Sequence, residues 1–179
     1  MIEFKKVINN ILANGDKRNT RSGEVLSLFN QNMEFDLEKG FPATTIKKLM
    51  FKAVAGELLW FLSGSTDIAD LRKYSCKEPD AWTIWSDDVL RWNTRKGTPE
   101  STDAGLLYGH QWRNYGHKID QIKQVIHSLK YDPYSRYHVV TAWAPIDKAQ
   151  EAMALPACHR DFQMHVDGKG RLNLHFTMR

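Results

Sequence analysis

The stretch MALPACHRDFQ places a cysteine, Cys158, directly after a proline turn and before a strand-like run. Lone cysteines are most often buried and inert, so a packed core thiol is one interpretation. A thiol at a turn-to-strand junction can instead face a cleft and act as a nucleophile. His159, Arg160 or an arginine from elsewhere in the chain could favour the thiolate. Because successive strand residues point to opposite faces, His159 is not expected to be the direct base.

Two further side chains could take part in such chemistry. Glu57 interrupts the apolar run AVAGELLWFL, where a carboxylate is costly unless it is paired or functional. It is therefore predicted either to move protons or to bind a buried backbone group. Tyr108 opens YGHQWRNYG, a stretch richer in aromatic residues than a plain surface loop needs. It could polarise a carbonyl or steer a proton, or it could simply pack.

Arginines lie beside predicted loops or strand ends, at Arg18, Arg21, Arg136 and Arg179. A guanidinium group matches the geometry of a phosphate, so these positions suit phosphate binding. Any single one could equally be a solvated surface charge.

Composition narrows the class of protein. The 179 residues are 42% apolar and 26% charged, an ordinary balance for one compact domain. The net charge of +4 comes without a dense basic block, so no specific nucleic-acid partner is predicted. No apolar run is long enough to cross a membrane, and a cytoplasmic location is expected. Cys76 and Cys158 are predicted to be thiols, and without a CxxC pair no metal site is expected.

Periodicity predicts an α+β fold in a single domain, residues 1–179, with no linker or repeat. Helices are predicted near the N-terminus, over 46–63, over 65–74 and over 117–132. Strands are predicted over 25–37, interrupted by a turn near residues 30–32, and over 137–145, 158–166 and 171–179, with a hairpin turn at 167–170. Loops are predicted over 14–24 and over 77–104. The helix ending at Gly64 is apolar almost all round, so it should lie in the middle of the domain.

Nine blocks in this order resemble the thymidylate synthase family. They are RSG at Arg21, GFPATT at Gly40, KK at Lys47, ELLWFLSGST at Glu57, IW at Ile84, YGHQWR at Tyr108, IDQI at Ile119, TAWAP at Thr141 and MALPACH at Met153. The resemblance implies a central mixed or antiparallel sheet with a buried central helix and flanking helices. It also implies conversion of dUMP to dTMP with 5,10-methylenetetrahydrofolate as co-substrate, without a metal.

The same resemblance assigns roles to individual residues. Cys158 matches the nucleophile that adds to C6 of the pyrimidine, Glu57 a carboxylate that moves protons near O4, and Tyr108 a tyrosine that assists proton removal from C5. Ile84 and Trp85 match residues that line the folate pocket. Arg21 and Arg179 match phosphate ligands, and Arg136 would reach the phosphate bound by a partner subunit in a homodimer.

Departures from the family pattern keep two alternatives open. Tyr137 stands where a second arginine is usual, and Ser86 to Asp88 differ from the usual run after IW. A deoxypyrimidine-monophosphate hydroxymethylase shares the thiolate chemistry, and a non-catalytic remnant would tolerate such losses. The chain resembles the N-terminal two-thirds of a synthase, so we expect it to be inactive alone or to need a complementing C-terminal polypeptide.

Overall fold

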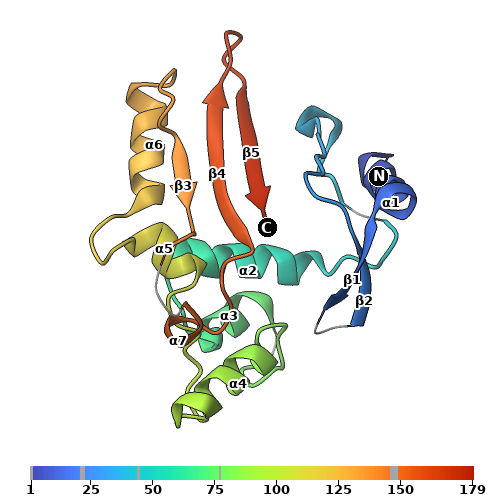
Figure 1. Ribbon diagram of the computed structural model, residues 1–179. Helices are drawn as coiled ribbons and strands as arrows, with labels where there is room; N and C mark the ends of the chain where they lie inside the picture. The colour runs from blue at the N-terminus through green and yellow to red at the C-terminus, as the bar shows by residue number, and fades with distance from the viewer. Residues whose placement is uncertain (1, 21–22, 44, 77, 146–148) are drawn as a thin grey trace. The chain divides into compact units, whose positions relative to one another are not determined.

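The computed structural model describes residues 2–20, 23–43, 45–76, 78–145 and 149–179. The elements in these ranges are α1 (Ile2–Asn14), β1 (Asp16–Thr20), β2 (Gly23–Ser27), η1 (Leu37–Lys39), α2 (Phe51–Ser63), α3 (Ile68–Ser75), α4 (Ser86–Lys96), α5 (Tyr108–Asn114), α6 (Gln121–Tyr131), β3 (Val139–Thr141), α7 (Ala149–Ala152), β4 (His159–Val166) and β5 (Leu172–Met178). Helices and antiparallel strands occur together, in agreement with the predicted α+β class (Figure 1). The chain divides into two compact units, residues 1–50 and 51–179.

The first unit contains α1 and a hairpin that the sequence did not reveal. Residues 14–24 were predicted to be a loop, but β1 pairs with β2 along its whole length, with Asp16 opposite Ser27. Every residue of β1 is exposed, so the strand has no alternation of apolar and polar residues from which to predict it. Strand β2 ends at Ser27, shortly before the turn predicted near residues 30–32, and the strand predicted after that turn is not found in the described ranges.

Helix α2 is the central helix of the second unit. It begins at Phe51 rather than at residue 46 and ends before Gly64, whose positive φ of 84° favours glycine. Gly56 and Trp60 are buried, because α3 packs closely at Gly56, where an added Cβ would lie 2.8 Å from the Cα of Ser75. The opposite face of α2 is open, with Leu58 50% exposed. The expectation of a helix buried all round is therefore met on one face only.

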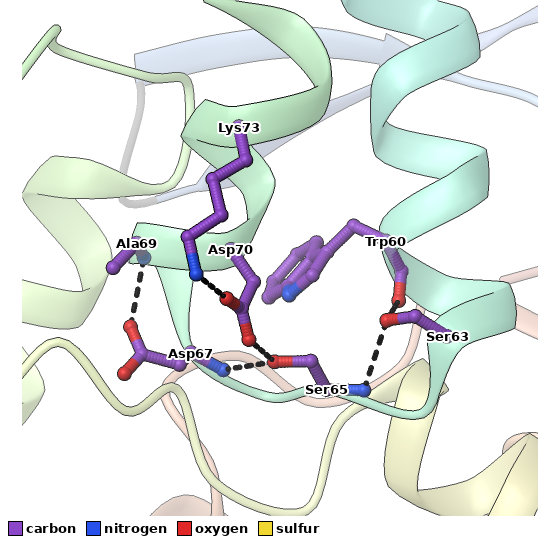
Figure 2. A network of polar contacts seen from close by, with 7 residues as sticks. All are labelled: Trp60, Ser63, Ser65, Asp67, Ala69, Asp70 and Lys73. Carbon is purple, nitrogen blue, oxygen red and sulfur yellow. Dashed lines mark hydrogen bonds and ion pairs between the residues drawn. The ribbon is translucent and has the colours of Figure 1, made fainter. Parts of the chain in front are cut away.

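The turn from α2 into α3 is fixed by side-chain hydrogen bonds (Figure 2). Ser65 Oγ donates to Asp70 Oδ2 at 2.7 Å and accepts the backbone N–H of Asp67 at 3.1 Å. Asp67 is the N-cap of α3, and its carboxylate accepts the backbone N–H of Ala69 at 2.7 Å. The hydrogen bond from Lys73 lowers the pKa of Asp70. These hydrogen bonds fix the position at which α3 begins.

Residues 77–104, predicted to be irregular, contain the helix α4. Its buried apolar residues are only Val89 and Trp92, which continue from Trp85 at helical spacing. The rest of the buried face is polar, because Asn93 is 1% exposed and donates to the carbonyls of Ser101 and Asp103. Such a narrow apolar stripe is too weak to predict a helix from hydrophobic periodicity.

The second unit also holds a sheet with the order β3-β4-β5 within its described residues, antiparallel throughout. The hairpin between β4 and β5 turns at residues 167–170, as predicted, and Gly170 N donates to Asp167 O at 2.9 Å. Strand β3 is shorter than predicted, and the four-residue helix α7 was not predicted. Helices α5 and α6 pack against the β3 side of the sheet, where Val140 and Phe162 are buried. This packing brings α5 beside the start of β4.

Candidate active site

Cys158 lies immediately before β4, at the end of the turn that Pro156 introduces. Its side chain is exposed, so the interpretation as a packed core thiol is wrong. The backbone around it is firmly held, because Cys158 N donates to Tyr108 Oη at 2.8 Å and Cys158 O accepts from Arg179 N at 3.0 Å. An accessible sulfur on a fixed backbone is the arrangement that a nucleophile requires.

Tyr108 is the first residue of α5 and reaches this turn with its hydroxyl group. The side chain is 5% exposed, and its Oη also accepts the backbone N–H of His159, at 3.2 Å. Burial raises the pKa of the phenol, and the two backbone hydrogen bonds oppose that rise. Since both N–H groups donate to the oxygen, the phenol proton is left to donate to another acceptor.

Glu57 is half-buried on α2 and is bound to the neighbouring indole. Trp85 Nε1 donates to Glu57 Oε1 at 2.6 Å, and Glu57 Oε2 carries no hydrogen bond within the described part of the chain. Trp85 is 8% exposed, and its ring centroid lies 6.3 Å from that of Tyr108. The indole therefore connects the carboxylate to the tyrosine and leaves one carboxylate oxygen for a ligand or water.

Arg179 follows β5 and clamps the turn before the cysteine. Its Nε donates to Ala157 O at 2.9 Å and its Nη2 to Pro156 O at 3.0 Å. The guanidinium carbon also lies 5.8 Å from the centre of the Trp143 ring. No hydrogen bond of Nη1 is found among the described residues, so a donor remains for an anion next to Cys158.

His159 and Arg160 are engaged with other side chains. Arg160 Nε donates to Asp161 Oδ2 at 2.6 Å. The His159 ring lies between two rings, with centroids 5.3 Å from Tyr108 and 5.0 Å from Phe176. Burial lowers the pKa of His159, and the negative charge of Glu57 opposes this only in part. The imidazole is thus a poor source of positive charge, whereas Arg179, distant in the sequence, places its guanidinium on the turn before Cys158.

The other predicted site residues are not brought to the cysteine in the described structure. Ile84 is 85% exposed, although its neighbour Trp85 is buried. Arg136 is exposed, and its carbonyl accepts from Gln163 Nε2 at 3.4 Å. Gln163 is five residues along β4 from Cys158, a separation of about 16 Å in a strand. Arg21 lies outside the described residues.

Sequence reasoning missed three contributors to this cluster: the hydrogen bond from Trp85 to Glu57, the ring contacts of His159 and the position of Trp143 beside Arg179. For the ring contacts of His159, the only signal in the sequence was that His159 follows Cys158 directly. The other two depend on pairing between distant elements. No group of three or more metal-ligating side chains occurs in the described ranges. In the same ranges no helix is both long and apolar enough to span a membrane.

A family model described as thymidylate synthase matches residues 2–179. The chain belongs to the thymidylate synthase family. It is 42% identical over 187 residues to a protein of Escherichia phage T5 described as a probable thymidylate synthase, covering 100% of this chain and 63% of that protein. The crystal structure of thymidylate synthase from phage T4 superposes with a TM-score of 0.89 at 38% identity, covering 100% of this chain and 62% of that one.

These comparisons confirm the family resemblance and the fold class predicted from the sequence. The chain spans less than two-thirds of the length of either relative.

Proposed function

We propose that this chain supplies the nucleophile, the proton-transfer groups and one phosphate ligand of a thymidylate synthase. The reaction would be the reductive methylation of dUMP to dTMP. The observation that supports this most directly is the exposed Cys158 sulfur on a turn held by Tyr108 and Arg179. A thiol placed for attack beside a cation is expected where a covalent adduct forms.

In the first step the Cys158 thiolate forms a bond to C6 of the uracil ring. The electron pair of the C5–C6 double bond moves toward C5 and O4, so C5 becomes nucleophilic. Tyr108 and Glu57 are suited to manage the protons, because the phenol proton and one carboxylate oxygen are both uncommitted. We assign Glu57 to water-mediated proton transfer near O4 and Tyr108 to assisting removal of the C5 proton.

The co-substrate in this proposal is 5,10-methylenetetrahydrofolate, which supplies the one-carbon unit and the hydride and leaves as dihydrofolate. Trp85 and Ile84 are proposed to line its site. The exposure of Ile84 is in keeping with a side chain that packs on a ligand rather than on the core.

Phosphate binding is proposed to use Arg179 and Arg21, with Arg136 acting in the neighbouring subunit of a homodimer. Arg179 has a free donor next to the cysteine. Arg136 is exposed, and its backbone lies beside Gln163, about 16 Å along β4 from Cys158. Donation of Arg136 to a second subunit accounts for this distance.

Because the relatives are longer, we also propose that the 179-residue chain is inactive alone and needs the remainder of the family fold. The assay measures dTMP and dihydrofolate for the chain alone and after addition of a polypeptide carrying the part of the phage T5 relative outside the matched region. We expect both products only in the mixture, and neither with the Cys158→Ser variant.

Two results would contradict this proposal. Formation of a hydroxymethylated nucleotide without dihydrofolate would indicate the hydroxymethylase reaction. Equal turnover by the Cys158→Ser variant would exclude the thiolate mechanism. Activity of the isolated chain would refute only its proposed dependence on a second polypeptide.

A further inference from the structure

His110 and His117 bring their imidazole rings together at the end of α5. His110 is half-buried on this helix, and His117 is exposed on the turn that follows it. The ring centroids lie 4.8 Å apart, and the ring planes are inclined by 66°. Two histidines that meet in this way, with no part in the proposed reaction, form a separate candidate site.

The backbone of the turn holds the second ring in place. His117 has a positive φ of 61°, which histidine adopts more readily than most other residues with a side chain. Its backbone N–H donates to Asn114 O at 2.9 Å, and Tyr115 N donates to Ile119 O at 2.8 Å. The closed turn therefore keeps the His117 ring beside the helix that carries His110.

Both rings have nitrogen atoms available to a ligand. Among the described residues no hydrogen bond or ion pair of either imidazole is found. Burial, and to a smaller extent the charge of His117, lowers the pKa of His110, which favours its neutral form. A neutral imidazole is the commonest metal ligand in proteins.

The ring geometry suits two ligands of one transition-metal ion. Zinc–nitrogen bonds of about 2.0–2.1 Å place each ring centroid about 3.2 Å from the ion. For N–metal–N angles between about 90° and 110°, the two centroids are then about 4.5–5.2 Å apart. The observed 4.8 Å lies in this range. Two metal-free rings in edge contact have a similar separation, so only a binding measurement distinguishes the two arrangements.

The surroundings favour a nitrogen-binding ion over a hard one. No carboxylate, thiol or third imidazole completes a metal-ligating group with the pair in the described ranges. Asp120, three residues after His117, is already bound to Arg113 Nη2 at 2.9 Å. Mg²⁺ and Ca²⁺ take oxygen ligands, whereas imidazole suits Zn²⁺, Ni²⁺ and Cu²⁺. Water would fill the remaining coordination positions.

We propose that His110 and His117 form a binding site for one divalent transition-metal ion, separate from the site around Cys158. The ion would link α5 to the turn that follows it. Because it would bind the folded arrangement of the two rings, it should stabilise the folded chain. The proposal is independent of the proposed function, since neither histidine has a step in that reaction.

The test measures Zn²⁺ binding by isothermal titration calorimetry, with every chain carrying Cys158→Ser so that the exposed thiol does not compete. Half the ligand set of a structural zinc site should supply about half its binding free energy, so we expect one ion per chain with a Kd between about 1 μM and 0.2 mM. His117→Asn should weaken binding at least about tenfold, because asparagine tolerates the positive φ but supplies no imidazole.

His127→Asn is the matched control. The His127 side chain is exposed and also contacts a ring, that of Tyr131, with the centroids 4.6 Å apart, but it has no histidine beside it. This variant should change the Kd less than about twofold. Circular dichroism checks that both variants fold, and His110→Gln tests the other ligand.

Long-range ¹H–¹⁵N NMR spectra identify the ligands, since bound zinc shifts the resonance of the ring nitrogen that it occupies. We expect shifts at both His110 and His117, and a rise in Tm with Zn²⁺ that His117→Asn abolishes. The proposal would be overturned by no saturable binding, by an unchanged Kd in His117→Asn, or by shifts that spare either of the two rings. None of these outcomes depends on dTMP formation, so they leave the proposed function untouched.

Discussion

The hydroxyl oxygen of Tyr108 lies 2.8 Å from the backbone nitrogen of Cys158 and accepts its hydrogen bond. A residue at the start of α5 thereby holds the turn that carries the thiol, fifty positions away in the sequence. The same oxygen accepts from His159, so the tyrosine fixes two successive peptide groups. The Tyr108 hydroxyl oxygen therefore has two roles in this proposal. It belongs to the group proposed to transfer a proton, and it sets the position of the proposed nucleophile.

Replacing Tyr108 by phenylalanine should therefore destabilise the chain. The variant leaves two partly buried N–H groups without an acceptor, which should cost about 1–3 kcal/mol in the free energy of unfolding. Urea denaturation followed by tryptophan fluorescence measures this change. Tyr134→Phe is the matched control, because the Tyr134 side chain is 69% exposed. A loss no larger than that of the control would contradict the structural role of the hydroxyl.

The two thiols should differ in accessibility. Cys158 is exposed, whereas Cys76 is half-buried and lies 3.4 Å from Ser75 Oγ. Iodoacetamide at limiting concentration should alkylate Cys158 first, and peptide mass spectrometry reads out the order. Preferential modification of Cys76 would show that the turn does not present the Cys158 sulfur to solvent.

Substitutions at Glu57 should separate the effect of its negative charge from the effect of its hydrogen bond with Trp85. Glu57→Gln keeps an acceptor for Trp85 Nε1 but removes the carboxylate, so turnover of the complemented enzyme should fall by about 10²–10⁴ with tryptophan fluorescence unchanged. Glu57→Leu should alter the fluorescence as well, because the indole loses its partner. Glu100→Gln, at an exposed glutamate, serves as the control. Full activity in Glu57→Gln would remove the carboxylate from the mechanism.

Stability should depend on pH near neutrality through His159. Burial lowers the pKa of this imidazole in the folded chain below the value of about 6.5 in the unfolded chain. The unfolded state then binds more protons in this window, so the free energy of unfolding rises as pH increases toward and through 6.5. His159→Phe keeps a ring between Tyr108 and Phe176 but cannot titrate. Unfolding curves between pH 5.5 and 7.5 should show a shallower slope for this variant, and an undiminished slope would refute the assignment.

Much of the second unit could be predicted because its elements have strong patterns. The alternation of Leu172, Leu174 and Phe176 predicted β5, and the helical spacing of Ile122, Val125 and Leu129 predicted α6. Helix α4 escaped prediction because its buried face includes Ser86 and Asn93. Strand β1 escaped because each of its residues is exposed, so its pairing with β2 and not burial defines it.

The candidate site could be predicted in its residues but not in its connections. An isolated carboxylate in an apolar run indicated Glu57, and the proline turn indicated Cys158. The sequence could not indicate that Trp85 binds Glu57 or that Arg179 clamps the turn, because each contact joins elements far apart in the chain. The roles carried over from the family for all the site residues stay predictions, as do the single domain and the cytoplasmic location.

The most direct test of the central claim is to trap the covalent intermediate. The 179-residue chain, combined with the part of the phage T5 relative outside the matched region, is incubated with 5-fluoro-dUMP and 5,10-methylenetetrahydrofolate and digested for mass spectrometry. We predict that both molecules are attached to the peptide containing Cys158, and that Cys158→Ser forms no adduct. An adduct at Cys76, or none in a mixture whose binding has been verified, would contradict the account.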